Sequence, residues 1–246
     1  MRASMQFGAI LWKESLDFKS KFISISLSTI MGPLLYLIAF GWGLGDSIEV
    51  NGASYIVFVM PGIIAMNAMT NGFGVIANDL NMARIYLKTF ESLMTSPVKM
   101  SVFTIARITA NVLRSLYGAA LLFLLSLIFN APLKIDWFFI LVIVLNCYVF
   151  STIGFIAGIL VKSHAGMAKL SNFVITPMSF LCGTFFPLEK FPALLRSVFK
   201  VLPLTQAVRA LREGFISPES FAAPLVLVAY IIVLMPVAIR LCTHAE

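Results

Sequence analysis

The stretch Lys88-Thr-Phe-Glu-Ser-Leu-Met-Thr-Ser-Pro-Val98 is the one charged, amphipathic interruption in the first half of an otherwise apolar chain. Around it, between residues 78 and 102, apolar side chains recur at helical spacing, which predicts a short helix with one apolar face. The serine before Pro97 ends this helix, because a residue preceding proline is disfavoured in the α region. Such a helix either lies at a membrane surface and contacts a soluble partner, or belongs to a solvated loop between two spans. The predicted apolar face consists of Tyr86, Leu87, Phe90, Leu93 and Met94, and Arg84, Lys88 and Glu91 point elsewhere.

The overall composition is that of an integral membrane protein. Of the 246 residues, 60% are hydrophobic and 12% are charged, and the mean hydropathy is +0.96, whereas soluble domains carry about 25% charged residues. The chain has too few polar side chains to cover a surface in water. We therefore interpret the net charge of +7 as cytoplasmic loops and contacts with anionic membrane lipid. No nucleic-acid partner is predicted, because no basic run is interleaved with aromatic residues.

Six apolar segments follow one another along the chain. A crossing needs about 20 apolar residues, and the fifth segment, which breaks at Gly183 and Pro187, is somewhat short. We predict an all-α integral membrane fold with six transmembrane helices, forming a single permease-sized domain over residues 1–246. An amphipathic helix over residues 1–21 lies along the membrane interface or is solvated. The six segments are residues 22–44, 55–77, 101–129, 137–161, 170–186 and 222–239.

Two of the predicted spans carry polar side chains at membrane depth. Asn67 and Asn71 lie in the second, and together with its glycines they predict a position inside a helix bundle. Arg107, Asn111 and Arg114 recur at i, i+4 and i+7 of the third, so they share one helix face. A charge at this depth is costly. These arginines either snorkel or form structural ion pairs, or they contact cargo or a partner, and the deeper Arg114 is expected to matter more.

Two later stretches predict close packing and a break in the pattern of spans. Gly154 and Gly158 match the small-xxx-small spacing at which helix backbones approach each other. Residues 187–216 contain two half-length amphipathic helices separated by Pro203, which predicts a re-entrant or surface hairpin. Between these stretches, residues 162–169 form a predicted basic turn.

The charges of the loops predict that both termini lie in the cytoplasm. The N-terminal arm, residues 84–99, residues 162–169 and Arg240 are basic, whereas residues 46–49 carry only acidic charges. Under the positive-inside rule the basic side is cytoplasmic. The basic stretch 190–212 would then lie outside, which conflicts with the rule. The charges of interfacial helices and of longer loops have less influence on orientation under this rule, so we still predict cytoplasmic termini.

No motif for catalysis or nucleotide binding occurs in the sequence. It contains no P-loop, no His-Glu-x-x-His and no Gly-x-Ser-x-Gly element, and we predict no catalytic, cofactor-binding or metal-binding residue. Cys147, Cys182 and Cys242 lack metal-ligand spacing and are predicted to be buried. The chain is therefore predicted to be a transport protein and not an enzyme. The alternatives are a secondary transporter, although no internal repeat is visible, and an intramembrane enzyme or assembly factor.

Two motifs carry a resemblance to a known family. Residues 89–98 resemble the motif that follows the second span in the permease subunits of type-2 ABC exporters. Residues 202–212, Leu-Pro-Leu-Thr-Gln-Ala-Val-Arg-Ala-Leu-Arg, resemble the segment before their last span. Together with the order of the spans, the resemblance covers nearly the whole chain. Phe90 departs from it, since many relatives have a smaller or different residue before the glutamate.

The resemblance implies a multi-pass permease of the bacterial cytoplasmic (inner) membrane that exports a lipid-linked glycan, a lipid, a peptide or a hydrophobic drug. It would form a homodimer and bind two copies of a separate ABC ATP-binding subunit, which would hold the ATP and Mg. Residues 79–100 would include the coupling helix, residues 187–216 would close the exit, and the first and fifth spans would line the path. The implied ATPase-coupling residues are Arg84, Tyr86, Leu87, Lys88, Phe90, Glu91, Leu93, Met94 and Pro97, and those of the outer gate are Pro187, Pro203, Thr205, Arg209 and Arg212.

Overall fold

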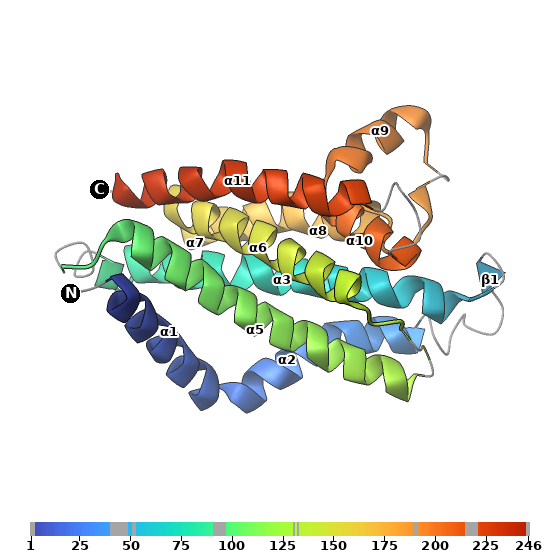
Figure 1. The fold of residues 1–246 in the computed structure, drawn as a ribbon, viewed down its shortest axis with the longest axis horizontal. Helices are drawn as coiled ribbons and strands as arrows, with labels where there is room; N and C mark the ends of the chain where they lie inside the picture. Colours follow the sequence, from blue (N-terminus) through green and yellow to red (C-terminus); the bar gives the residue numbers. More distant parts are fainter. Residues whose placement is uncertain are drawn as a thin grey trace.

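The computed structural model describes residues 3–39, 49–50, 53–90, 97–129, 131, 133–188, 191–214 and 221–244. Within these ranges the regular structure is helical, apart from a hairpin of two two-residue strands, β1 and β2 (Figure 1). The predicted all-α class is confirmed. The elements are α1 (Ala3–Ser20), α2 (Phe22–Leu37), β1 (Glu49–Val50), β2 (Ala53–Ser54), α3 (Tyr55–Ile85), α5 (Met100–Ile128), α6 (Trp137–Leu160), α7 (His164–Leu170), a π-helical segment (Ser171–Ile175), α8 (Thr176–Leu181), α9 (Ala193–Val201), α10 (Pro203–Glu213) and α11 (Ala222–Thr243).

Four helices, α3, α5, α6 and α11, are long and apolar enough to cross a membrane. A fifth candidate is the pair α1 and α2, whose axes are bent by 74°. The predicted fifth span, residues 170–186, begins at the last residue of α7 and contains the π-helical segment and α8; the three elements follow one another without a non-helical residue. The described chain therefore supports a multi-pass membrane protein with four or five span-length helices, and the exact six-span arrangement stays a prediction.

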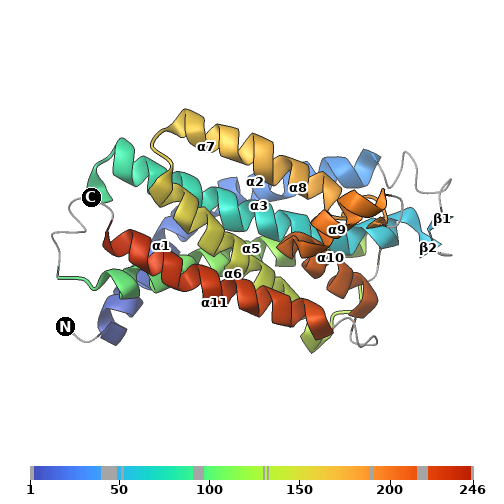
Figure 2. The same ribbon diagram turned by 90° about the horizontal axis from the view of Figure 1, so that it is seen from above.

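Helix α3 forms the centre of the bundle, where it packs mainly against α6 and α5 (Figures 1 and 2). Its packing against α6 depends on glycines of α6. A Cβ atom at Gly154 would lie 2.5 Å from the carbonyl oxygen of Phe73, and one at Gly158 would lie 2.9 Å from the Cβ atom of Leu80. Real Cβ atoms are not found so close to other heavy atoms. The small-xxx-small pattern thus marks a true contact of two backbones, as the sequence predicted.

The starts of α6 and α7 are fixed by side chains that accept hydrogen bonds from the first helical turn. Asp136 accepts from the backbone N–H of Phe139 at 2.8 Å, which places the start of α6 at the predicted residue. Ser163 accepts from the backbone N–H of Gly166 at 3.0 Å. Because of this cap the chain is already helical at His164, so the prediction that residues 162–169 form a turn is wrong for most of that stretch.

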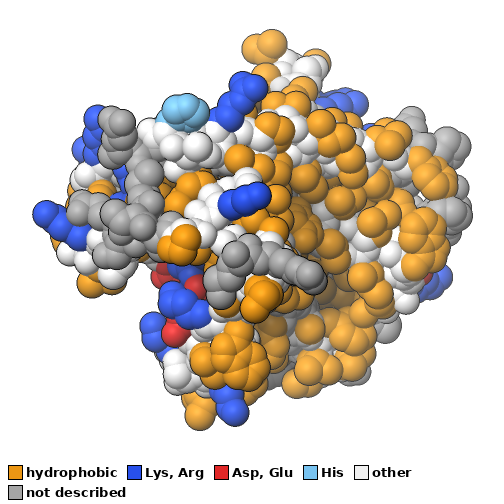
Figure 3. All heavy atoms as spheres, turned by 60° about the vertical axis from the view of Figure 1, so that its left-hand side comes forward, with side chains coloured by type: hydrophobic (Ala, Val, Ile, Leu, Met, Phe, Trp, Pro, Cys, Tyr) orange, Lys and Arg blue, Asp and Glu red, His pale blue; other side chains and the backbone are white. Residues whose placement is uncertain are grey.

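The two ends of the molecule differ in their elements. Figure 1 places both termini, the end of α3 and the start of α5 at the left end, and β1, α9 and α10 at the right end. At the right end the helical run from α7 to α8 stops before Gly183, which has a φ of 84° that suits glycine. This is the predicted break. The surface between the ends is mostly hydrophobic in Figure 3, where Lys and Arg side chains gather toward the left of the view.

Candidate coupling site and its anchors

The segment after α3 does not form the single amphipathic helix that the sequence predicted. Helix α3 continues through residues 78–85 and ends at Ile85, and the backbone N–H groups of Tyr86 and Leu87 both donate to the carbonyl oxygen of Met82 at 3.1 Å. Lys88 then adopts a φ of 51°, which is uncommon for a residue other than glycine and breaks the helix. Helical geometry resumes at residues 89–90. Of the predicted coupling residues, Glu91, Leu93 and Met94 lie outside the described residues.

This break separates the residues of the predicted apolar face. Tyr86 and Leu87 are 60% and 63% exposed, whereas Phe90 is only 5% exposed and belongs to the core of the bundle. The ring of Phe90 lies edge-on to that of Phe103 on α5, with centroids 6.3 Å apart, and Phe103 in turn contacts Phe155 on α6. The prediction that Tyr86 and Leu87 share one face with Phe90 is therefore wrong, because the left-handed residue Lys88 between them turns the chain.

Arg84 and Asn81 bind the end of α6 from the last turns of α3. The last carbonyl groups of a helix have no partner within it. Here Asn81 donates to the carbonyl oxygen of Val161 at 2.7 Å, and Arg84 donates to the carbonyl oxygens of Gly158, at 3.3 Å, and Ile159. The Arg84 guanidinium also lies 6.0 Å from the centre of the Phe90 ring. The end of α6 and the Phe90 segment are thus both attached to α3.

A buried amide ties the N-terminal helix to the far side of the same segment. Gln6 of α1 is 6% exposed, and its Nε2 donates to the carbonyl oxygen of Pro97 at 2.8 Å. Its Oε1 accepts from the backbone N–H of Lys99 at 3.4 Å. The sequence pattern predicted only that Pro97 ends a helix, and it did not single out Gln6. The one available signal was a long polar side chain beside the apolar residues of an amphipathic helix.

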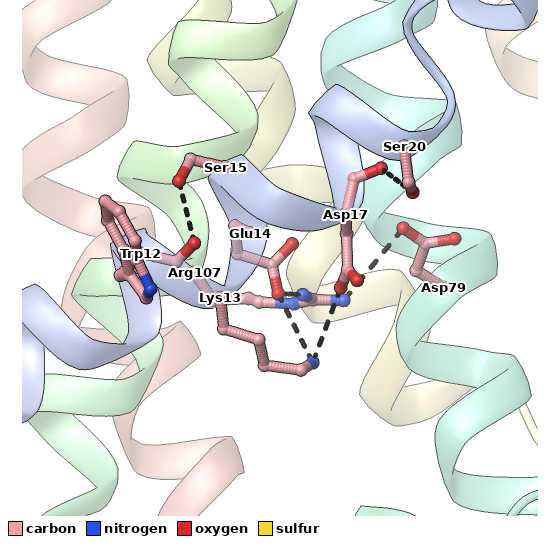
Figure 4. A network of polar contacts seen from close by, with 8 residues as sticks. All are labelled: Trp12, Lys13, Glu14, Ser15, Asp17, Ser20, Asp79 and Arg107. Atoms are coloured by element: carbon pink, nitrogen blue, oxygen red, sulfur yellow. Dashed lines mark hydrogen bonds and ion pairs between the residues drawn. The ribbon is translucent and has the colours of Figure 1, made fainter.

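A cluster of charged side chains joins α1 to the body of the bundle (Figure 4). Arg107 of α5 forms an ion pair with Glu14 of α1, and its second terminal nitrogen lies 3.9 Å from Asp79 of α3. Lys13 lies 3.7 Å from Glu14 and 3.8 Å from Asp17. For Arg107 the structure therefore shows the structural ion pair, which is one of the predicted alternatives. Arg114 has no hydrogen bond or ion pair with any of the described residues.

Amide side chains link the helices at the centre of the bundle. Asn111 of α5 donates to the carbonyl oxygen of Gly72 at 2.7 Å and to the hydroxyl of Ser151 at 2.8 Å, and it thereby connects three helices. Asn67 donates to the carbonyl oxygen of Thr29 on α2 at 3.2 Å, and Asn71 donates to Asn67 at 2.8 Å. The prediction that the second span lies inside the bundle is borne out.

At the opposite end, Arg212 of α10 holds three segments together. It donates to the carbonyl oxygens of Gly183 (2.6 Å), Thr184 (2.7 Å) and Phe58 (3.0 Å), and its guanidinium lies 3.8 Å from the centre of the Phe58 ring. The other predicted gate residues differ in their environment. Pro203 and Thr205 are buried in α10, Pro187 is half-buried, and Arg209 pairs with Glu213 at 2.8 Å on its own helix.

Comparison with known proteins identifies the family of this helix bundle. A family model described as the ABC-2 type transporter matches residues 5–216, which is most of the chain. The chain belongs to the ABC-2 type transporter family. As an ABC-2 type permease it is a transport subunit without enzymatic activity of its own, and membership of the family implies an ABC ATPase as its partner.

Curated relatives of this ABC-2 type permease match over nearly their full length. It is 29% identical to the inner membrane transport permease YadH of Escherichia coli K12 over 228 residues, which cover 90% of this chain and 88% of the relative. It is 28% identical to nodulation protein J of Rhizobium meliloti strain 1021 over 224 residues, which cover 88% of this chain and 82% of the relative. The similarity therefore includes both ends of the helix bundle.

Proposed function

We propose that this permease is the membrane-spanning half of an ATP-driven exporter, and that it receives motion from its ATPase through the segment after α3. The observation that carries the proposal is the division of this segment into two parts. Phe90 is buried and packs against Phe103 of α5, whereas Tyr86 and Leu87 before it are more than half exposed. A coupling element needs an exposed part that the ATPase can contact and a buried part that is packed against the membrane helices, so that a movement of the first displaces the second.

The anchors around Phe90 support the transmission of movement. ATP-driven closure of a motor changes the permease only if the two permease states differ in their interaction with the motor. A push on Tyr86 and Leu87 would reach α6 through Arg84 and Asn81, α5 through Phe90, and α1 through Gln6. Each of these links ends on a backbone carbonyl group or on a buried aromatic ring.

We infer the orientation from the elements at each end. The end that holds both termini also holds the end of α3 and the start of α5 (Figure 1). Arg84, Lys88 and Lys99 flank these helix ends, and Lys162 follows Val161, which is bonded to Asn81 of α3, so the positive-inside rule assigns this end to the cytoplasm. The name of YadH refers to the inner membrane, and the same location is proposed here. In this arrangement α1 is the interfacial helix, α2 and the run 164–181 complete six crossings, and α9 with α10 forms the outer re-entrant hairpin.

The proposed assembly contains two identical permeases and two ATP-binding subunits that carry ATP and Mg. Exposed apolar side chains on α2, including Ile23, Leu27 and Leu35, offer a surface for lipid or for the second permease. The proposed cargo is a lipid-linked glycan, a lipid or a hydrophobic small molecule that leaves the cytoplasm. The resemblance assigns the first and fifth spans to its path.

The test compares exposed apolar residues at the two ends of the molecule. We expect the double variant Tyr86→Ser, Leu87→Ser to insert into membranes but to lose co-purification of the ABC ATP-binding subunit, identified by mass spectrometry of its P-loop peptide. Ile135→Ser, which alters an exposed apolar residue near the start of α6, is the control and should retain the ATPase. Equal retention of the ATPase by both variants would show that the segment after α3 is not its binding site.

A further inference from the structure

A concave site lies at the bend where α1 meets α2, on the side of the bundle away from α11 (Figure 1). The axes of the two helices are bent by 74°. The volume of the site is about 950 Å³, within the range of about 300–1,000 Å³ for ligand pockets. Its lining comes from these two helices and the residue between them, and the exposed lining residues that the argument uses are Lys19, Lys21, Ile23, Ser24, Leu27 and Met31.

The two lysines of this site have no anionic partner. The ammonium groups of Lys19 and Lys21 form no ion pair or hydrogen bond with any residue in the described part of the chain. Asp17, the acidic residue that precedes them, already lies 3.8 Å from Lys13. Two like charges beside one concave site repel each other, and an anion held between them would be attracted to both. The charge of the site therefore suits an anionic ligand.

The chemistry of the lining changes in a fixed order along α2. Lys21 precedes the first residue of the helix, and Ser24 in its first turn has a hydroxyl group without a hydrogen bond to any described residue. Ile23, Leu27 and Met31 recur at four-residue spacing, so they form one stripe, and they are 73%, 60% and 58% exposed. At 1.5 Å per residue, the stripe extends to about 15 Å from Lys21. Cation, hydroxyl and apolar stripe match the phosphate, glycerol esters and acyl chain of a phospholipid.

The depth of the site in the membrane also fits a phospholipid. Helix α2, residues 22–37, contains no charged side chain, so its length belongs to the apolar part of the membrane. Lysines directly before such a segment lie at the level of the lipid headgroups, where their ammonium groups meet phosphate. Basic residues at this level attract anionic lipids. The lysines and the apolar stripe thus lie where the two parts of one lipid molecule would be.

We propose that the bend between α1 and α2 holds one anionic phospholipid as a resident partner of the permease. Its phosphate would lie beside Lys19 and Lys21, and one acyl chain would lie along Ile23, Leu27 and Met31. A zwitterionic lipid fits less well, because its headgroup brings an ammonium group next to the two lysines. A second permease is disfavoured as the occupant, since a symmetric contact centred on this surface would bring four lysines together. The lipid would fix the angle between the two helices, and it would stay in place whichever cargo is exported.

Photolabelling with two lipids that differ only in the headgroup tests the proposal. The purified permease is reconstituted in phosphatidylcholine liposomes that contain a small, equal fraction of a diazirine-bearing phosphatidylglycerol or phosphatidylcholine. Mass spectrometry then measures the labelling of residues 23–31. Each lysine near a membrane surface strengthens the binding of an anionic lipid about fivefold, so two lysines should give about 30-fold stronger labelling by phosphatidylglycerol. Equal labelling by the two lipids would overturn the proposal.

Variants distinguish a site at the bend from a general attraction to a basic helix. Lys19→Gln and Lys21→Gln should each lower labelling by phosphatidylglycerol about fivefold, and Lys21→Arg should retain it. Lys13→Gln removes the same charge from an exposed lysine of α1 that lies outside the site, and it should leave labelling nearly unchanged. If Lys13→Gln lowered labelling as much as Lys21→Gln, the attraction would be that of the whole helix and the proposed site would not exist.

Two further measurements identify other occupants of the site. An Ile23→Cys variant that forms a disulfide between two copies in the same liposomes would show that a second permease covers the site, which overturns the proposal. Labelling during ATP hydrolysis by the reconstituted complex should be as strong as labelling without ATP. Its loss would show that the lipid leaves the site with each cycle, as cargo does, and would refute a resident lipid. Labelling of the permease alone needs no ATPase, so failure of the proposed export mechanism would not affect the first test.

Discussion

Replacement of Arg212 by alanine should detach the turn after α8 from α3 and α10. The side chain donates three hydrogen bonds to backbone carbonyls at 2.6, 2.7 and 3.0 Å. A hydrogen bond from a charged donor contributes about 1.5 kcal/mol or more, and three would give about 4.5 kcal/mol. Arg212 is partly accessible to solvent, so solvent screening reduces the expected loss to about 2–3 kcal/mol. The cation–π contact with Phe58 at 3.8 Å is included in this range.

The native cysteines offer a local measurement of this loss. Cys182 is fully buried and precedes Gly183, whose carbonyl accepts from Arg212. Cys147 is fully buried in α6, away from this end. In the purified permease a maleimide reacts with Cys182 only when the turn opens. A loss of about 2–3 kcal/mol raises the open population about 30- to 150-fold. We expect this increase in the labelling rate of Cys182 in the Arg212→Ala variant, with Cys147 still protected.

Two neighbouring substitutions make the experiment decisive. Arg209→Ala removes another arginine from α10, whose ion pair is with Glu213 on the same helix, and exposed pairs of this type contribute only about 0.3–0.5 kcal/mol. Arg212→Lys keeps the charge but cannot reach three carbonyls at once, so its labelling rate should be intermediate. If Arg212→Ala labels Cys182 no faster than Arg209→Ala does, the three hydrogen bonds do not hold this end together.

Three other predictions follow from the contacts within the bundle. Gly154→Ala places a methyl group 2.5 Å from a carbonyl oxygen of α3 and should lower the unfolding temperature, whereas Gly74→Ala meets nothing within 4 Å and should not. Phe90→Ala removes a buried ring and should lower ATP-driven transport by the reconstituted complex while the ATPase still co-purifies. If the variant lost both ATP-driven transport and co-purification of the ATPase, the substitution would have caused a general folding defect. Arg107→Ala should destabilise the protein more than Arg114→Ala in a thermal unfolding assay, because only Arg107 has ion-pair partners among the described residues; the opposite order would show that depth in the membrane decides the effect.

The sequence predicted those features that a single helix encodes. Apolar length located the spans, and the four-residue spacing of Gly154 and Gly158 located a backbone contact that the structure confirms. The break at Lys88 could not be predicted, because no glycine or proline marks it and the apolar spacing continues through it. The partners of Gln6 and Arg84 could not be predicted either. They are backbone groups of segments distant in the sequence, and nearly every residue type presents the same backbone groups.

Helix α3 extends from the proposed outer end of the permease to its proposed cytoplasmic end. Its 31 residues give a length of about 46 Å, and it carries Phe58, held by Arg212, near its start and Arg84 near its end. It also packs backbone to backbone against α6 at Gly154, so these two helices should move together. By contrast, α2 and α8 face α3 across a groove of about 280 Å³, whose lining residues include Thr29, Asn67 and Thr176. A push on the segment after α3 is therefore expected to shift α3 and α6 as one body past α2 and α8, and so to open or close the groove between them.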